Sequence, residues 1–574
     1  MREAVTATSP TTMCCTSDYL LAAGAPDDIA VVDGGSRHTY AELRFAAARL
    51  AGELSALALP AGSRVGILGP NSLFWIAGYL AVLRLGHVAV PFPDRLPADD
   101  LRRNAELVGC RAVLADRRSL RRYPTAALGP GTAIVTDEAL VRDGGTCRPE
   151  GTVVDPDADA VLLFTSGTTS RPKAVRITHR NIRANTEAIV EYLGLRPDDR
   201  VLVILPFSYC FGASLLHTHL RVGARVVLCN SFVFPETAVE LMDREECTVF
   251  AGVPSSFQLL LRAGSFASRE LPSLRIVQQA GGRLPEPLID ELVAAKPRAE
   301  LFVMYGQTEA TARLSYLPPR LLAEKKGSIG RGIPGVELLV LDEQGRRVRP
   351  GEQGEIYARG ASISPGYLGD PDGSASKLTP HGLRTGDLGT VDEDGYVYVT
   401  GRRDDFVKSW GFRVSCPEVE ACVQGLDGVT AVAAVGVPDD AAGEALVLVV
   451  VPRPGTVLLP GTVVAHCAGR LPKHMVPRAV RIVDALPLTP SGKVSRPALR
   501  ELVRSGDEAT GDPQPRRHRP GPVGRQTPPV HQDQPARREP PGRQDQSRPR
   551  VRSLQDPVRL EETSEHDHPI PSPR

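Results

Sequence analysis

Short apolar runs alternate with helix-like segments along most of this chain, and that alternation limits the possible folds more than any other feature. We predict strands at residues 64–68, 88–90, 112–115, 201–205, 226–228, 249–253 and 275–279. We predict helices at residues 39–57, 73–83, 101–108, 235–246 and 287–296. Strands separated by helices form β-α-β units, so the sequence predicts an α/β protein with mostly parallel sheets.

From residue 335 onward the pattern changes to short alternating runs interrupted by Gly, Asp and Pro. Residues 336–341, 354–358 and 395–399 predict a twisted antiparallel sheet or a small β-barrel. The charged cluster at 401–405 predicts a hinge, and the segments beyond it predict a small α+β domain. We therefore expect a large N-terminal domain of layered α/β sheets with a small β-barrel-like part, followed by a small mobile C-terminal domain.

The end of the chain has a different composition. Residues 506–574 are rich in Pro, Arg, Gln and Asp and contain no Phe, Trp, Tyr, Met, Cys or Lys. Such a segment buries too little apolar surface to offset its chain entropy, so we predict a disordered Pro/Arg-rich tail. The predicted boundaries are 17–403 for the N-terminal domain, 404–505 for the C-terminal domain and 506–574 for the tail.

Composition and spacing argue against several classes of partner. The chain has 68 Lys and Arg against 67 Asp and Glu, so nothing suggests a nucleic-acid partner. The most apolar window, residues 73–83, is too short to span a bilayer, and we expect no membrane span. Ten cysteines without zinc spacing, and no visible signal peptide, predict a cytoplasmic protein with reduced thiols. His217 and His219 do not share a helix face, so we expect core packing or a surface position rather than a metal site.

A strand-like run at residues 160–164 ends in a loop of hydroxyl and glycine residues that Lys173 closes. The loop contains Thr165, Ser166, Gly167, Thr168 and Thr169. Polyphosphate oxygens only accept hydrogen bonds and carry a large charge, so hydroxyls, free backbone N–H groups and a lysine suit them. The loop is not a Walker motif, because that pattern of glycines and lysine is absent. It predicts a triphosphate site, with a solvated linker as the alternative.

Two further segments follow apolar runs and carry groups that a nucleotide needs. Gly281 and Gly282 allow a flat ligand to approach the backbone. Tyr305 offers a face for stacking on a base, Thr308 offers a hydroxyl for a phosphate, and Glu309 offers a hard oxygen ligand for Mg²⁺. The alternatives are a tight turn at the glycines and core packing at the tyrosine.

The last two segments lie nearer the C-terminus. Asp387, next to a glycine and between apolar residues, is able to accept hydrogen bonds from both hydroxyls of a ribose. Lys493 lies on a loop bounded by Pro and Gly, which predicts a mobile cation. Taken singly, these residues are equally well explained as a turn aspartate and a solvated lysine.

Together the five segments, with a hinge-like segment at 401–413, resemble the adenylate-forming superfamily of acyl-CoA synthetases, peptide-synthetase adenylation domains and luciferases. The resemblance covers about residues 20–503 and implies a free-standing AMP-dependent acid–thiol ligase. It implies binding of ATP and Mg²⁺, formation of acyl-AMP with release of pyrophosphate, and transfer of the acyl group. The acceptor is the thiol of CoA or of a carrier-protein phosphopantetheine.

The resemblance also implies a role for each matching residue. Residues 165–173 would cover the β- and γ-phosphates, with Lys173 among the catalytic groups. Gly281, Gly282 and Arg283 would line the adenine side, while Tyr305 and Gly306 would flank the base. Thr308 would touch the α-phosphate, Glu309 would hold the Mg²⁺, and Asp387 and Arg402 would hold the ribose.

In the C-terminal part, the implied roles concern motion and charge. Asp404 would be the pivot between domains, and Lys408 and Gly411 would line the path of the thiol. Lys493 would bridge the substrate carboxylate and the α-phosphate. A carboxylate that attacks phosphorus brings two anions together, and a lysine and Mg²⁺ offset their repulsion. Ser170 and Ala174 stand where the family more often has glycines, but the Ser170 hydroxyl can donate to phosphate, so we expect activity to survive.

The segment at 206–214 is similar to the family's acid-pocket segment. We expect the acid to be bordered by Phe207, Tyr209, Phe211 and Gly212. Adenylation domains for α-amino acids place an Asp at the position of Gly212, yet nothing acidic lies between 205 and 221. A buried ammonium without a partner is costly, so an uncharged-tail fatty or aryl acid is favoured.

Three alternatives stay open. The first is an aminoacyl-AMP ligase that loads a carrier protein. The second is a non-catalytic scaffold that binds a nucleotide, and the retention of Glu309 and Lys493 argues against it. The third is a luciferase-like monooxygenase on the same fold, which no sequence feature specifically favours.

Overall fold

The computed structural model of the 574-residue chain describes residues 15–123, 125–129, 131–141, 152–165, 172–232, 234–402, 406–409, 412–439, 443–489 and 494–507. The predicted tail beyond residue 507 lies outside the described residues, as do most of the phosphate loop and the 403–405 part of the hinge.

The first sheet is six-stranded and mostly parallel, as the alternating pattern predicts. Its strands are β3 (Arg64–Leu68), β4 (Val88–Phe92), β5 (Ala112–Ala115), β6 (Ala133–Thr136), β7 (Asp159–Thr165) and β8 (Lys173–Thr178). Their spatial order is β6-β5-β3-β4-β7-β8, and only the β7–β8 pair is antiparallel. The helices in this part of the chain are α1 (Thr16–Leu21), α2 (Tyr40–Ala56), α3 (Leu73–Arg84), α4 (Ala98–Val108) and α5 (Arg117–Arg122), with 3-10 turns at Thr125–Leu128 and Asp137–Leu140.

The second sheet has nine strands and a parallel centre. Its strands are β1 (Ile29–Asp33), β2 (Ser36–Thr39), β9 (Arg200–Val203), β10 (Arg225–Leu228), β11 (Val249–Gly252), β12 (Ile276–Gln279), β13 (Glu300–Tyr305), β14 (Ser315–Leu317) and β15 (Arg331–Gly332). Their order is β15-β14-β13-β12-β11-β9-β10-β1-β2, with antiparallel pairs only at the two ends. The associated helices are α6 (His179–Leu193), α7 (Cys210–Val222), α8 (Pro235–Arg244), α9 (Pro254–Ala263) and α10 (Glu286–Ala295).

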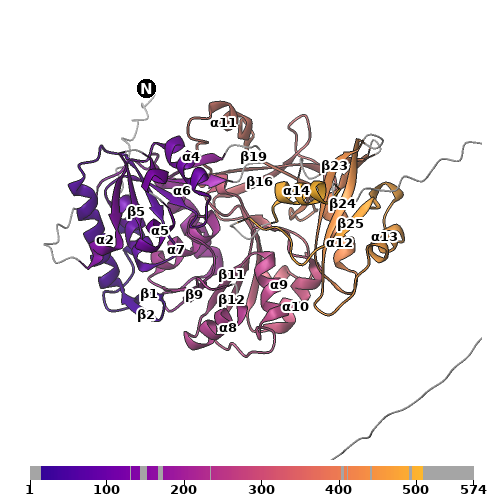
Figure 1. Ribbon diagram of the computed structural model, residues 1–574, viewed down its shortest axis with the longest axis horizontal. Coiled ribbons are helices and arrows are strands. Elements are labelled where there is room, and N and C mark those ends of the chain that lie inside the picture. Colours follow the sequence, from indigo (N-terminus) through magenta and orange to yellow (C-terminus); the bar gives the residue numbers. More distant parts are fainter. Residues whose placement is uncertain are drawn as a thin grey trace, which may run out of the picture. The chain divides into compact units, whose positions relative to one another are not determined.

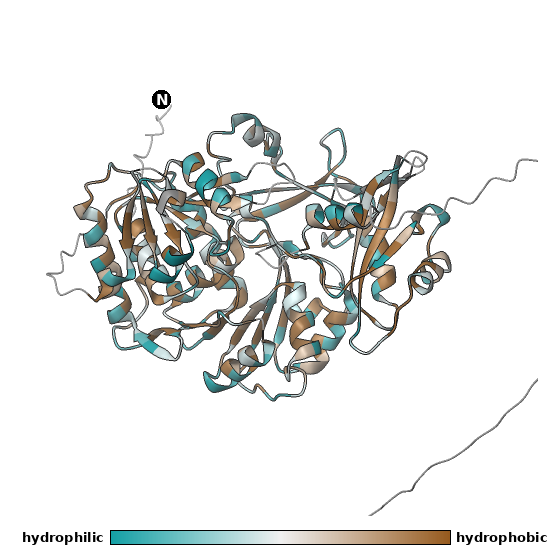
Figure 2. Cartoon of the chain, viewed as in Figure 1, coloured by the Kyte–Doolittle hydropathy of each residue, from teal (hydrophilic) through white to brown (hydrophobic). Residues whose placement is uncertain are grey.

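The nine-stranded sheet buries both faces. Alternate residues of β12 and β13 belong to different cores, because successive side chains of a strand point to opposite sides. Ile276 and Phe302 join the core that includes α3, α6 and α7, whereas Val277 and Val303 join the core under α8, α9 and α10. Figure 1 shows α8, α9 and α10 beside β11 and β12, and Figure 2 shows the apolar colouring of the strands that these helices cover.

Residues 336–402 form the predicted antiparallel part. The strands are β16 (Val336–Leu341), β17 (Gln353–Gly360), β18 (Leu378–Thr379), β19 (Gly382–Val391) and β20 (Val397–Arg402). Every pair in this five-stranded sheet is antiparallel. Helix α11 (Pro371–Lys377) precedes β18, and 3-10 turns lie earlier, at Thr308–Ala310 and Pro319–Leu321.

The C-terminal part is α+β, as predicted. Its strands are β21 (Phe406–Ser409), β22 (Phe412–Ser415), β23 (Val429–Asp439), β24 (Gly443–Pro452) and β25 (Ala479–Ile482), and its helices are α12 (Cys416–Gln424), α13 (Pro460–Ala468) and α14 (Arg496–Asp507), with a 3-10 turn at Lys473–Met475. Leu446 and Leu448 of β24 pack with α12 and α13, while Val447 and Val449 pack with Leu499 of α14. The helices therefore cover opposite faces of the sheet, as Figure 1 shows.

Local sequence signals explain where several helices begin. Helix α2 starts with a capping box in which Glu42 N donates to Thr39 Oγ1 at 3.1 Å and Thr39 N donates to Glu42 Oε2 at 2.8 Å. Ser72 caps α3 by accepting a hydrogen bond from Trp75 N at 3.1 Å. Within the described part of the chain, no helix combines the length and apolar character needed to cross a membrane.

Candidate active site

Lys173 begins β8 opposite the last residue of β7, so the two ends of the predicted phosphate loop are held together by strand pairing. Thr165 and Lys173 are register partners. The Lys173 ammonium lies 2.9 Å from Asp370 Oδ2 and 4.7 Å from the ring centre of Tyr367. The pKa of Asp370 is lowered chiefly by its hydrogen bond with Lys173. Ser166, Gly167, Thr168, Thr169 and Ser170 lie outside the described residues.

Glu309 joins this lysine through a shared tyrosine. Tyr367 donates a hydrogen bond from its hydroxyl to Glu309 Oε1 at 2.7 Å, while its ring faces Lys173. Burial and the neighbouring Glu309 carboxylate raise the pKa of Tyr367, so the hydroxyl stays a donor. A hard carboxylate oxygen held beside a cation suits the Mg²⁺–phosphate part of a nucleotide.

We expect the Tyr367→Phe change to weaken, but not abolish, the binding of Mg²⁺-ATP. Loss of one hydrogen bond to Glu309 should raise KM for Mg²⁺-ATP severalfold and lower the free energy of unfolding by about 1 kcal/mol. Initial-rate kinetics and urea unfolding measure the two effects. Tyr398→Phe is the matched control. Tyr398 lies on β20, and its hydroxyl likewise donates a hydrogen bond to a carboxylate, that of Asp392, at 3.4 Å. An equal rise in KM in both variants would contradict the placement of Tyr367.

A second polar group forms where β13, β19 and β20 meet. Asp387 and Arg402 are register partners on β19 and β20, and Arg402 Nε donates to Asp387 Oδ1 at 3.1 Å. Tyr305, at the end of β13, donates its hydroxyl to the other carboxylate oxygen of Asp387. Burial, followed by the Asp387 charge, raises the pKa of Tyr305 well above its usual value. Residues far apart in sequence thus share one carboxylate that is 6% exposed.

The backbone accounts for glycine at Gly281 and at Gly306 in different ways. Gly281 has φ +87°, a left-handed conformation that side chains disfavour, in the turn after β12. The neighbouring Gly282 carbonyl accepts a hydrogen bond from Gln279 Nε2 at 2.8 Å, and Arg283 is exposed. At Gly306, an added Cβ would lie 1.8 Å from the Ala312 carbonyl oxygen. Gly306 therefore lets the segment after β13 fold back on itself, whatever else it contacts.

The acid-pocket segment is fixed by a buried asparagine. Asn71 accepts from Phe207 N and donates to the Leu205 carbonyl, both at 2.9 Å. Phe207 is fully buried and packs on Trp75 with ring centres 5.3 Å apart. An added Cβ at Gly212 would lie 2.1 Å from the Pro206 carbonyl oxygen. The backbone therefore leaves no room for an aspartate at this position.

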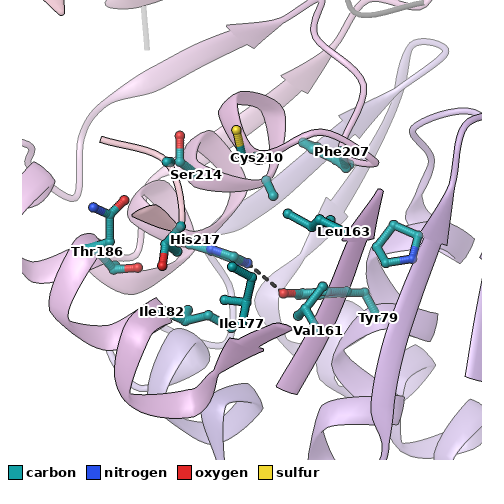
Figure 3. A pocket seen from close by; sticks show the side chains of 15 residues that line it. Tyr79, Val161, Leu163, Ile177, Ile182, Thr186, Phe207, Cys210, Ser214 and His217 are labelled. Carbon is teal, nitrogen blue, oxygen red and sulfur yellow. Dashed lines mark hydrogen bonds between the residues drawn. The ribbon is translucent and has the colours of Figure 1, made fainter. Parts of the chain in front are cut away.

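A small cavity of about 20 Å³ lies behind this segment. Its wall includes one face of α7, with Cys210, Ala213, Ser214 and His217 at helical spacing. Figure 3 shows Cys210, Ser214 and His217 of this face together with Val161 and Leu163 of β7 and Ile182 of α6. None of the described residues that line this cavity is acidic. Of the four predicted pocket residues only Phe207 lines this cavity, and Tyr209, Phe211 and Gly212 do not.

Tyr79 and His217 form a buried polar pair in the cavity wall that the sequence did not predict. Their Oη and Nε2 atoms are 2.8 Å apart, as the dashed line in Figure 3 marks. Burial lowers the pKa of His217 to about 3, so the imidazole is neutral at physiological pH. The expected packing role of His217 and His219 is consistent with their burial, and no metal-binding cluster occurs among the residues that the structure describes.

The buried histidines predict a loss of stability at acid pH. Burial lowers the pKa of His217 to about 3 and that of His219 to about 4, so the unfolded chain binds more protons. The two neutral histidines make their full contribution to the free energy of unfolding above about pH 6.5. Below that pH, each histidine should lower the free energy of unfolding by about 1.4 kcal/mol per pH unit. Urea unfolding at several pH values between neutral and mildly acid measures this loss. His217→Gln should reduce the slope, and an unchanged slope would contradict a neutral buried His217.

The segment from Tyr305 to Ala312 connects the polar group around Asp387, the polar group around Glu309 and the cavity. Thr308 donates its hydroxyl to Cys210 Sγ at 3.5 Å, which places it against the cavity wall. Glu309, the next residue, accepts the hydrogen bond from Tyr367, and Thr311 and Ala312 line the cavity. Thr311 adopts φ +66°, which is rare for a β-branched residue, and its hydroxyl donates to the Ser362 carbonyl at 2.7 Å. One strained turn therefore places the polar group of Glu309, Tyr367 and Lys173 next to an apolar cavity.

In the C-terminal part of the chain, the side chains of four predicted site residues cannot be placed. Asp404, Gly411 and Lys493 lie outside the described residues, and only the backbone of Lys408, in β21, lies within them. Their assigned roles stay predictions.

The chain matches the family described as AMP-binding enzyme over residues 21–368, and that family's C-terminal domain over residues 418–493. The chain belongs to the AMP-binding enzyme family. It is an enzyme that uses ATP to convert a carboxylic acid to acyl-AMP and then transfers the acyl group to CoA. ATP, Mg²⁺ and CoA are accordingly its cofactors and co-substrates.

Several members of the family are similar to this chain. A 3-[(3aS,4S,7aS)-7a-methyl-1,5-dioxo-octahydro-1H-inden-4-yl]propanoyl:CoA ligase from Rhodococcus jostii is 33% identical, over 82% of this chain and 95% of its own. A feruloyl-CoA synthase from Amycolatopsis is 33% identical, over 83% and 96%. Among solved structures, o-succinylbenzoate CoA synthetase from Bacillus subtilis with its acyl-adenylate intermediate is 26% identical, with a TM-score of 0.77 over 85% and 98%. That synthetase has also been solved with ATP and a magnesium ion.

Proposed function

We propose that the carboxylic acid this AMP-binding enzyme activates has an apolar aryl or alkyl body and no ammonium group. The observation that carries this proposal is the contact between Thr308, on the nucleotide side, and Cys210, in the wall of an apolar cavity. The cavity lining holds no carboxylate to pair an ammonium, and the backbone at Gly212 excludes one. The ring-bearing acids named for the relatives from Rhodococcus jostii and Amycolatopsis support the same choice.

The residue roles follow from the two polar groups. We assign residues 165–173 to the β- and γ-phosphates and Thr308 to the α-phosphate. Asp387 and Arg402 would hold the ribose hydroxyls, because the Asp387 carboxylate already has two donors fixed beside it. Glu309 would hold the Mg²⁺, which when bound lowers the charge repulsion between carboxylate and phosphate.

The adenine side would be formed by Gly281, Gly282 and Arg283, with Tyr305 and Gly306 at its edge. Tyr305 is tied by its hydroxyl to Asp387, which fixes the ring beside the carboxylate assigned to the ribose. Its ring is thereby pre-oriented for a base, which reduces the entropy lost on binding.

In the C-terminal domain, taken as residues 404–505, Lys493 would bridge the attacking carboxylate and the α-phosphate. Asp404 would be the pivot on which this domain changes its pose, and Lys408 and Gly411 would line the path of the thiol. A carrier-protein phosphopantetheine is the alternative acceptor. A cytoplasmic location fits the eight free cysteines of the described residues.

Acid-dependent pyrophosphate exchange with a panel of acids tests the proposal. Aryl and alkyl acids should support exchange, whereas α-amino acids should support little. CoA and phosphopantetheinylated carrier proteins are then compared as acceptors at equal concentration. Exchange with an α-amino acid, followed by transfer only to a carrier protein, would replace this proposal with an aminoacyl ligase. Tight ATP binding without exchange for any acid would indicate the non-catalytic scaffold.

A further inference from the structure

Arg313 is a buried cation without a counterion among the described residues. The residue is 2% exposed, and its Nη2 atom has no hydrogen-bond partner there. Its Nε donates to Met304 Sδ at 3.3 Å, a weak acceptor. Burial lowers the pKa of Arg313, and the groups that oppose this are Tyr192, which also makes a side-chain hydrogen bond with it, and Cys210, neither of which is a carboxylate.

The backbone of Arg313 adjoins the cavity wall. Arg313 directly follows Thr311 and Ala312, which line the cavity, and its backbone is held by Asn185, which also lines it. The Asn185 Nδ2 donates to the Arg313 carbonyl at 2.9 Å, and Arg313 N donates to Asn185 Oδ1 at 3.3 Å. The guanidinium carbon is 4.0 Å from the ring centre of Phe211, the neighbour of Cys210 in α7.

Gln278 adds a second unpartnered polar side chain on the same sheet face. It is 1% exposed, and neither its Nε2 nor its Oε1 has a partner among the described residues. Gln278 pairs with Phe302 in the β12–β13 register, and Phe302 and Met304 pack in the core that includes Ile276 and Ala280. Because side chains alternate along a strand, Gln278 faces the side on which Arg313 contacts Met304.

Such groups are costly unless something binds to them. A buried charge or amide without a partner loses its hydration and gains nothing in return, and native interiors contain few of them. A carboxylate supplies what both groups lack, since it accepts hydrogen bonds from a guanidinium fork and from an amide N–H. The Gln278 Oε1 would still need a donor, which a bound water can provide.

We propose that Arg313 and Gln278 recognise a second carboxylate at the far end of the acid, so that the enzyme activates dicarboxylic acids with an apolar body between the two groups. This inference rests on the proposed function, because it names the acid for the same site. It replaces the expectation of an uncharged tail. One carboxylate oxygen bonds to the α-phosphorus as the bond to the pyrophosphate oxygen breaks, and the second carboxylate leaves in the product unchanged.

Pyrophosphate exchange with matched acids tests this recognition. Hexanoate is compared with hexanedioate, and 3-phenylpropanoate with its ring-carboxylated derivatives, on the parent and on Arg313→Met and Arg313→Lys. The matched control is Arg331→Met, because Arg331 also stacks on an aromatic ring, 4.4 Å from the centre of Tyr396. Each kcat/KM is measured together with the melting temperature.

The parent should favour at least one diacid over its monoacid by about tenfold or more, since a site built to pair a group rejects ligands that lack it. Arg313→Met should abolish that preference by lowering kcat/KM for the diacid alone, Arg313→Lys should keep part of it, and Arg331→Met should keep all of it. Equal or better use of monoacids by the parent overturns the proposal, even if Arg313→Met does not fold. An equal loss for both acids in a folded Arg313→Met also overturns it. Absence of exchange with every acid instead defeats the proposed function.

Discussion

We expect the replacement of Lys493 with alanine to lower the rate of acyl-adenylate formation by about 100-fold or more, because preorganised charges at a reacting centre contribute that much to catalysis. The substrate carboxylate and the α-phosphate repel each other as they approach, and the role proposed for Lys493 is to offset that repulsion. The second half-reaction has no such encounter of anions. Transfer from a synthetic acyl-adenylate to CoA should therefore stay within about threefold of the parent, a change too small to signal a lost catalytic interaction.

Pyrophosphate exchange reports the first half-reaction, and thioester formation from the supplied acyl-adenylate reports the second. Lys473→Ala serves as the control, since Lys473 is an exposed lysine of the same C-terminal part of the chain. If Lys493→Ala exchanged pyrophosphate as fast as the parent, the role assigned to Lys493 would be wrong. If both half-reactions fell equally, the lysine would support the fold of its domain instead.

The Glu309→Gln change should lower adenylation by about 100-fold, a loss in the range measured when one such electrostatic group is removed. An amide retains the size of the side chain but loses the charge that a hard cation needs. Tyr367 can still donate to the amide oxygen, so the corner with Lys173 should keep its shape. The thermal stability of Glu309→Gln should therefore remain close to that of the parent.

A titration of Mg²⁺ separates a metal-binding defect from misfolding. Raising the Mg²⁺ concentration should recover part of the activity of Glu309→Gln, while the parent saturates early. The control is Glu236→Gln, because Glu236 accepts hydrogen bonds from Ser265 N and Oγ at 2.7 and 2.6 Å away from the site. A loss of activity that no Mg²⁺ concentration relieves would argue against a metal ligand at this position.

The sequence predicted the regular parts of this fold well because their signals are local. The apolar runs at 64–68 and 112–115 are strands with those same bounds, and the helix expected at 39–57 spans Tyr40 to Ala56. Alternation also predicted the antiparallel sheet that carries Asp387. What alternation could not supply was the division of the parallel strands between two sheets, because register between distant strands depends on tertiary packing.

The site was predictable only where a motif marks it. Glu309 and Asp387 stand in such motifs, whereas Tyr367 stands in none and acts only through its contacts with Glu309 and Lys173. The pair of Tyr79 and His217 joins residues 138 positions apart, and no spacing rule connects them. A helical reading of 210–217 would have placed His217 on the same face as Cys210, and this was the one signal available.

Arg313 is a further residue that the sequence did not mark as part of the site. Its position four residues after Glu309 gives no sign that it is buried, because arginines are usually exposed. Only its burial, and the lack of a described partner for Nη2, mark it as a group that awaits a ligand.

The central claim is that a carboxylate attacks the α-phosphorus of ATP, and the spent nucleotide tests it most directly. The purified enzyme is incubated with ATP, Mg²⁺, CoA and the best acid of the panel, and the nucleotides are separated and quantified. We predict AMP and pyrophosphate in equal amounts, formed only when the acid is present. Formation of ADP and phosphate, or AMP formation that does not depend on the acid, would contradict the account.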